Sequence, residues 1–166
     1  MSELRADSTF VQREDVVVVS TLKIIKLCEW EKGVGDSLVI GVLENDQYFE
    51  LFSSSVESTA VKELFNVPLK VVALEEITSV EECSRCDVIF FSELHNLQSI
   101  EDAVTLIGDS PVLLVGSVDN FLNGGGMIQF QYEKNQLSFR INAKRGRECG
   151  IRFRSSLLAL AKEVIR

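Results

Sequence analysis

The sequence has few basic residues and no long apolar run. Its 166 residues carry 17 lysines and arginines against 25 aspartates and glutamates, a formal net charge of −8 at pH 7. Nucleic-acid binding needs basic surface to neutralise phosphates, so this charge argues against such a partner. No apolar segment is long enough to cross a bilayer as a helix. The start of the chain also lacks a signal-peptide pattern. A mature fragment of an exported protein, with Met1 added, would lack this pattern as well, so export stays open.

Groups for nucleophilic catalysis are scarce as well. His95, in the loop "SELHNLQS", is the only histidine. An activated nucleophile would require this histidine to meet a cysteine or a serine in a cleft. We expect a lone loop histidine to be solvated and therefore predict no catalytic residues, although a pair between His95 and a cysteine or serine stays open.

Cofactor motifs are missing too. A dinucleotide-binding fingerprint would follow the first strand, but "SLVIGVL" leads directly into "ENDQYF". A phospho-receiver would have an aspartate at the end of a central strand, whereas Asp87 begins one. Gly124–Gly126 precede a strand rather than a helix, so they do not form a phosphate loop. The sequence therefore predicts no cofactor and a bend at these glycines.

The four cysteines are Cys28, Cys83, Cys86 and Cys149. Cys83 and Cys86 form a C-x-x-C directly before a strand, whereas a redox centre would use a helix N-terminus to lower a thiol pKa. A zinc site would need a second pair or histidines at matching spacing. We predict no metal site and expect structural thiols or disulfides, for which three full pairings are possible. Cys86 should be buried or locked in a disulfide.

Short apolar segments alternate with helical patterns through the middle of the chain. The apolar segments are nearly continuous, as in parallel strands covered on both faces. They are 37–43, 68–74, 87–93 and 111–117. Of the helical patterns between them, "SIEDAVTLIG" is predicted to start at Ser99 with Asp102 and to stop at Gly108. The alternation predicts an α/β fold, a Rossmann-like sandwich with a mostly parallel central sheet and flanking helices.

The two ends of this single domain are predicted to be helical. Residues 1–14 form a flexible N-terminal segment, and residues 15–166 form the domain. Asp15 opens an amphipathic helix that ends at Trp30, although its four valines leave a strand open. After Ser155 or Ser156, apolar residues at helical spacing predict a second helix that continues to Ile165.

A hairpin near the C-terminus is indicated by strict alternation. Apolar residues occupy every second position of 128–132 and 137–141. Folding the chain between Lys134 and Asn135 pairs every apolar residue with an apolar partner, and a slip of one residue would destroy the match. The predicted pairs are Tyr132 with Leu137, Phe130 with Phe139, and Ile128 with Ile141.

The polar face of this antiparallel hairpin is our candidate for a partner-binding surface. Together with the adjoining loop "AKRGRECG", it carries six polar or basic side chains. They are Gln129, Gln131, Arg140, Lys144, Arg145 and Arg147. A basic cluster on an otherwise acidic protein can steer an acidic partner toward it. The alternative is that these are ordinary solvated side chains, in which case an apolar patch near the C-terminal helix is the next candidate for the interface.

The C-terminal third closely resembles the YfiR family, whose pattern is a Phe, a Gly-Gly-Met-Ile, a hairpin that ends in Ile-Asn, and a Ser-Ser-Leu-Leu helix. The matching residues are Phe121, Gly125, Gly126, Met127, Ile128, Phe130, Phe139, Ile141, Asn142, Gly150, Ser155, Ser156, Leu157 and Leu158. Upstream, "TLKIIKLCEW", "LVIGVL" and "CDVIFFSE" resemble the family's opening helix with its Glu-Trp, its first strand and its Cys-His strand. The resemblance covers about residues 15 to 165.

This resemblance implies a non-enzymatic bacterial protein of the periplasm, whose leader would be absent from this chain. It implies a regulator that restrains a membrane-anchored diguanylate cyclase by binding that enzyme's periplasmic part, which affects cyclic-di-GMP and biofilm. It further implies a possible homodimer, and disulfides linked to stability and redox sensing. Asp87 stands where the family has histidine, and the cysteines do not clearly reproduce a family disulfide pattern. The alternative is a periplasmic small-ligand sensor with no cyclase partner, which would need a sizeable apolar pocket.

Overall fold

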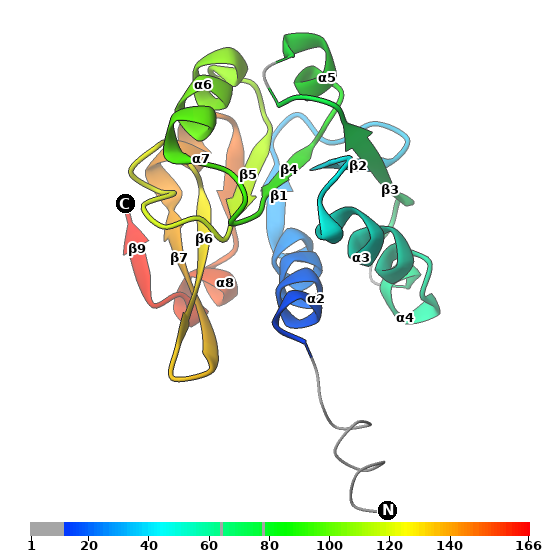
Figure 1. Ribbon diagram of the computed structural model, residues 1–166, viewed down its shortest axis with the longest axis horizontal. Helices are drawn as coiled ribbons and strands as arrows, with labels where there is room; N and C mark the ends of the chain where they lie inside the picture. Colours follow the sequence, from blue (N-terminus) through cyan, green and yellow to red (C-terminus); the bar gives the residue numbers. More distant parts are fainter. Residues whose placement is uncertain (1–11, 64, 78) are drawn as a thin grey trace, which may run out of the picture.

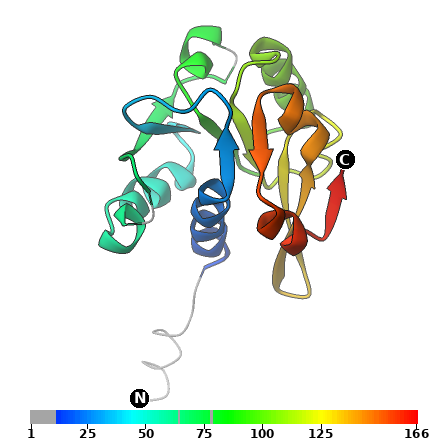
Figure 2. The ribbon, with the colours of Figure 1, turned by 180° about the vertical axis from the view of Figure 1, so that it is seen from behind.

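A seven-stranded sheet, sandwiched between helices, forms the centre of the protein (Figures 1 and 2). The computed structural model describes residues 12–63, 65–77 and 79–166. The strand order is β3-β2-β4-β5-β6-β7-β9. The bounds are β2 (Leu38–Leu43), β3 (Leu69–Leu74), β4 (Val88–Phe91), β5 (Leu113–Gly116), β6 (Ile128–Glu133), β7 (Gln136–Asn142) and β9 (Glu163–Ile165). Strands β2 to β6 pair in parallel and β7 pairs antiparallel to β6, which confirms the predicted α/β fold.

Both faces of the sheet are covered. Successive side chains of a strand point to opposite faces, so Val88 and Phe90 pack in one apolar cluster while Ile89 and Phe91 pack in the other. The first cluster includes residues of α2 (Arg13–Lys26), α3 (Gln47–Val56) and α8 (Ser155–Leu160); the second includes residues of α5 (Val80–Ser84) and α6 (Leu97–Ile107). A short helix, α4 (Thr59–Lys62), follows α3. This burial explains why β2, β4 and β5 are apolar at nearly every position.

The first helix differs from its predicted limits. Helix α2 already includes Arg13 and Glu14, which we predicted to be flexible; residues 1–11 of that segment lie outside the described part of the chain. At its other end the helix stops at Lys26. Among the helices of the described residues, none is both long and apolar enough to span a membrane.

Trp30 belongs to a strand rather than to the end of this helix, so its predicted place is wrong. Strand β1 (Cys28–Trp30) pairs antiparallel with β8 (Ile151–Phe153) in a separate two-stranded sheet. The half-buried Trp30 donates a hydrogen bond from Nε1 to the carbonyl oxygen of Pro111 at 3.1 Å. Its partner strand is remote in sequence, which is why the local helical spacing was misleading.

Two further helix limits are corrected. Helix α6 starts after Asn96, whose Oδ1 accepts a hydrogen bond from the backbone N–H of Ser99 at 2.8 Å, so Ser99 lies inside the first turn. Its predicted end at Gly108 is confirmed. The C-terminal helix α8 ends at Leu160 instead of Ile165, and β9 then pairs in parallel with β7 at the sheet edge (Figure 1). The residues that we predicted to continue helix α8 therefore pair with β7 as a strand.

The hairpin has the predicted register. Tyr132 lies opposite Leu137, Phe130 opposite Phe139, and Ile128 opposite Ile141. The turn residues Lys134 and Asn135 have φ values of 52° and 63°. Two consecutive positive φ angles suit the tight turns whose twist matches that of the flanking strands.

The three glycines before the hairpin form a bend, as predicted. Gly125 has a φ of 105°, which L side chains rarely adopt. The backbone N–H of Gly126 donates a hydrogen bond to the carbonyl oxygen of Phe121 at 3.0 Å. A Cβ atom on Gly126 would lie 2.3 Å from two atoms of the buried Phe121 ring. Glycine is required here because the loop between β5 and β6 passes directly over that ring.

Gly126→Ala should therefore destabilise the protein by about 1–3 kcal/mol, the usual cost of overpacking a core. The matched control is Gly35→Ala, where an added Cβ meets no atom of the described residues within 4 Å. Urea unfolding followed by circular dichroism measures both changes. Equal midpoints for Gly126→Ala and the wild type would contradict the close packing of Phe121.

Candidate functional site

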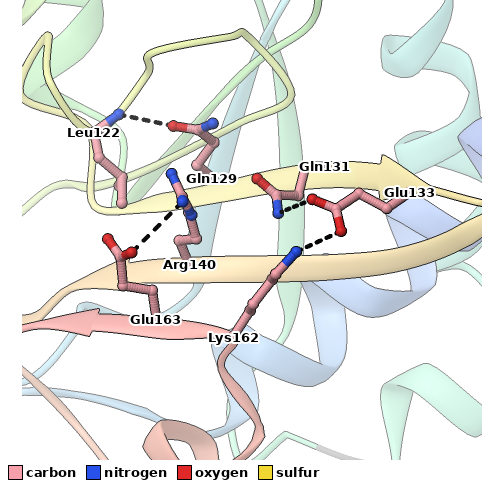
Figure 3. A network of polar contacts seen from close by, with 7 residues as sticks. All are labelled: Leu122, Gln129, Gln131, Glu133, Arg140, Lys162 and Glu163. Atoms are coloured by element: carbon pink, nitrogen blue, oxygen red, sulfur yellow. Dashed lines mark hydrogen bonds and ion pairs between the residues drawn. The ribbon is translucent and has the colours of Figure 1, made fainter.

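The polar face of the hairpin is partly buried, and its side chains make polar contacts with neighbouring segments (Figure 3). Gln129 is only 7% exposed, and its Oε1 accepts a hydrogen bond from the backbone N–H of Leu122 at 3.1 Å. The half-buried Gln131 donates from Nε2 to Glu133 at 3.2 Å. The prediction that Gln129 contributes to a surface is wrong, because the β5–β6 loop folds back over its end of the strand. The alternation of apolar and polar residues within a strand does not indicate whether a distant loop covers the polar face.

Arg140 joins the hairpin to the last strand. Its Nη2 atom lies 3.5 Å from a carboxylate oxygen of Glu163 in β9. A second ion pair, between Lys162 and Glu133, connects the segment before β9 with the end of β6 (Figure 3). The side chains of Arg140 and Glu163 are 38% and 51% exposed, so Arg140 remains accessible although it is paired.

The predicted basic loop is a helix, α7 (Ala143–Glu148). Asn142 caps it, since its Oδ1 accepts from the backbone N–H of Arg145 at 3.0 Å. Asparagine is among the strongest N-cap residues, and this signal could have indicated the helix. The basic side chains of α7 are consequently separated into inward-directed and exposed ones.

Arg145 points inward and closes the end of α6. Its side chain is 15% exposed, and Nη1 lies 3.7 Å from Asp109 and 3.8 Å from Glu148. Its Nη2 donates to the carbonyl oxygen of Gly108, the C-cap of α6, at 2.6 Å. Lys144 and Arg147 are exposed. The structure thus leaves only these two basic side chains of α7 free to meet a partner.

An apolar groove lies between α2, β7 and α8, and we name it the α2–β7–α8 groove. It has a volume of about 510 Å³. It is lined by Val16, Ser20, Lys23, Ile24, Leu27, Phe130, Gln136, Leu137, Phe139, Leu157 and Leu160. Leu160 at its edge is 69% exposed. Our sequence interpretation placed Leu160 on a continuous helical stripe and gave an apolar patch near the C-terminal helix only as the second choice of interface; the helix ends at Leu160 and leaves that leucine uncovered.

His95 is partly buried rather than solvated, which corrects our expectation. Its ring packs edge-on against Phe91, with centroids 5.3 Å apart, and Nδ1 lies 3.1 Å from the carbonyl oxygen of Ser92. Removal from water lowers the pKa of the imidazole. The hydrogen bond goes to a backbone carbonyl, so the His–Ser or His–Cys pair that catalysis would need is not among the contacts of His95 in the described residues.

All four cysteines are buried free thiols. Cys86 is 4% exposed, as predicted for a residue that leads a strand, and its removal from water raises the pKa of the thiol to about 12. Such a thiol is a poor nucleophile. In the part of the chain that the structure describes, no three His, Cys, Asp or Glu side chains gather as a metal site.

Comparison with known proteins finds one matching family and several similar solved structures. The family described as YfiR/HmsC-like matches residues 14–162. A comparison with curated proteins finds no match. Among solved structures, a conserved domain protein from Vibrio cholerae O1 biovar El Tor is similar at 12% identity and a TM-score of 0.59, over 93% of this chain and 60% of that one. The ABC domain of a Streptococcus pneumonia protein in complex with L-Trp is similar at 15% identity and a TM-score of 0.59, over 87% and 59%.

These structural similarities show the fold alone, because the identities are low. The chain spans 59–60% of the length of the two solved structures. Activity and partners therefore have to be argued from the surfaces described above.

Proposed function

Because the chain belongs to the YfiR/HmsC-like family, we propose that it is a non-enzymatic periplasmic regulator of cyclic-di-GMP signalling. It binds the periplasmic part of a membrane-anchored diguanylate cyclase and restrains that enzyme. Release of the cyclase raises cyclic-di-GMP and favours biofilm. The family match over residues 14–162 is the observation that carries this proposal.

The α2–β7–α8 groove is the surface that best suits contact with a protein. Leu137 and Phe139 are only partly buried within it, and Leu160 is 69% exposed at its edge. Contiguous exposed apolar surface is typical of interaction sites, and an apolar groove can hold the apolar face of a partner helix. Lys23 lies among the lining residues and adds a positive charge to an otherwise acidic protein.

The sequence-predicted surface remains a second candidate in a reduced form. Lys144 and Arg147 are exposed on α7, Arg140 is accessible beside Glu163, and Gln131 is half-buried. Gln129 and Arg145 are excluded because their polar groups are used inside the fold. A homodimer formed through the same groove is the alternative occupant.

Leu160→Glu should weaken binding to the periplasmic domain of a cyclase encoded beside this protein by at least about tenfold, or roughly 1.4 kcal/mol. A carboxylate in the groove would have to be desolvated when the partner covers it. The matched control is Leu94→Glu, since Leu94 is 74% exposed and lies outside the groove. Calorimetric titration measures both affinities, and sedimentation of the free protein determines whether a second copy occupies the groove.

The double variant Lys144→Glu/Arg147→Glu tests the reduced basic surface in the same assay. A loss of affinity in this variant alone would place the interface on α7 instead of the groove. Failure of the wild-type protein to bind the cyclase domain at all would contradict the proposed function.

A further inference from the structure

A separate cavity of about 290 Å³ lies at the carboxyl ends of the parallel strands, and we name it the strand-end cavity. It shares only Phe130 with the α2–β7–α8 groove. The chain leaves β2 toward β3 and returns to β4 on the other side of β2, so the strand order reverses between β2 and β4. In open parallel sheets, ligands bind beside such a reversal, outside the carboxyl ends. Tyr48 follows β2, Glu93 follows β4 and Ser117 follows β5, and all three line the cavity.

Two hydroxyl groups in the lining of this cavity lack hydrogen-bond partners within the described part of the chain. The Oγ atom of Ser117 is buried and has no hydrogen-bond partner among the residues that the structure describes. Tyr48 is 2% exposed and its ring packs on Phe90, with centroids 4.7 Å apart. Its backbone N–H donates a hydrogen bond to Oδ1 of Asp46. Its hydroxyl oxygen also lacks a partner among the described residues, but this atom is accessible and lies in the cavity lining. Buried polar groups are normally satisfied, so the unpartnered Ser117 hydroxyl, together with the Tyr48 hydroxyl that is open to the same cavity, indicates a ligand that supplies hydrogen bonds there.

The charge around the cavity is negative. Glu93 and Asp119 line it with exposed carboxylates, and neither forms an ion pair with another described residue. The basic residue in the lining is Arg13, whose guanidinium lies 4.2 Å above the ring of Tyr132. Burial raises the pKa of Tyr48, and the charges of Glu93, Glu14 and Asp46 raise it further. The field inside the cavity therefore favours a positively charged ligand.

We propose that the strand-end cavity binds a small organic amine as its ammonium ion. An ammonium group has three donors and no acceptor. Glu93 and Asp119 accept from it at the mouth, and the hydroxyl oxygens of Ser117 and Tyr48 accept farther inside. A metal ion suits the cavity less well, because the described residues hold no group of three His, Cys, Asp or Glu side chains that could bind one. This inference concerns a site that the proposed contact with the cyclase does not use.

Calorimetric titration of the purified protein with putrescine tests the proposal, with succinate as a probe of similar length and opposite charge. Putrescine should bind and succinate should not. The double variant Glu93→Gln/Asp119→Asn should weaken putrescine binding by about tenfold or more. Tyr48→Phe keeps the ring against Phe90 and should weaken it severalfold. The control Asp36→Asn removes an exposed carboxylate outside the cavity lining and should leave the affinity unchanged.

Three results would overturn the proposal. The first is an absence of binding heat with putrescine at millimolar concentration. The second is an equal affinity of the double variant and the wild type, which would show attraction to the net negative charge alone. The third is binding of succinate in preference to putrescine, which would assign the cavity to an anion through Arg13.

Discussion

Phe130→Asp is expected to unfold the protein, or to lower its melting temperature by about 10 °C or more. Phe130 is 3% exposed and meets Phe139 edge-on across the hairpin, with ring centroids 6.4 Å apart. Loss of a buried phenylalanine ring alone costs about 3–5 kcal/mol, and a desolvated carboxylate adds to that cost. A typical domain has a free energy of unfolding of about 5–15 kcal/mol. The two costs together would therefore remove about half or more of the free energy of unfolding.

The control for this change is Leu94→Asp, which introduces the same charge at a leucine that is 74% exposed. Its melting temperature should match that of the wild type. Thermal unfolding followed by circular dichroism compares the three proteins. A Phe130→Asp variant as stable as Leu94→Asp would mean that the apolar face of the hairpin is not in the core.

Arg145→Glu should destabilise the protein by about 2–4 kcal/mol, because a charged hydrogen bond is lost and the new carboxylate is repelled by its neighbours. The wild-type guanidinium donates to the carbonyl oxygen of Gly108 and lies within 4 Å of Asp109 and Glu148. A glutamate in its place would face a carbonyl dipole and two carboxylates. Asp109 is 86% exposed and contributes little, so most of the effect comes from the Gly108 carbonyl.

Arg147→Glu is the matched control, since Arg147 is exposed on the same helix two positions away. Surface substitutions of this kind change stability by about 0.5 kcal/mol or less. Urea unfolding midpoints measure the difference between the two variants. Equal midpoints would show that Arg145 does not hold α6 and α7 together. If Arg145→Glu destabilises the fold, a loss of binding in this variant could not be assigned to the interface. Arg145 should then be left unchanged in binding experiments.

The parts of the fold that were predicted correctly depend on neighbours in sequence. The register of β6 and β7 follows from alternation and a tight turn, so Tyr132 and Leu137 could be paired from the sequence alone. The parallel strands were recognisable because burial on both faces makes them apolar throughout. The wrong predictions concern partners that are distant. Trp30 pairs with β8 and Ile165 with β7, and no local period distinguishes these strands from extensions of a helix.

In the candidate site, too, the wrong predictions concern residues whose partners are distant in sequence. Gln129 and Arg145 look like surface residues from their types, but each satisfies a backbone group of another segment, the N–H of Leu122 and the carbonyl of Gly108. Long polar side chains often serve to close loops and helix ends in this way. The exposure of Leu160 depends on where α8 stops, which the apolar spacing did not reveal.

The pairing of β1 with β8 has a consequence for the order of folding. The ion pair between Glu29 and Arg154 beside this small sheet joins positions 125 residues apart. Closing so long a loop is entropically costly until the intervening segments are compact, so we expect the contact to form late. The hairpin and the β2–β3 unit have local partners and can form early. During synthesis, α2 can pack early against α3, but the part of its apolar face that lines the α2–β7–α8 groove has to wait for β6, β7 and α8. Over that interval the nascent chain exposes apolar surface on which a chaperone would act.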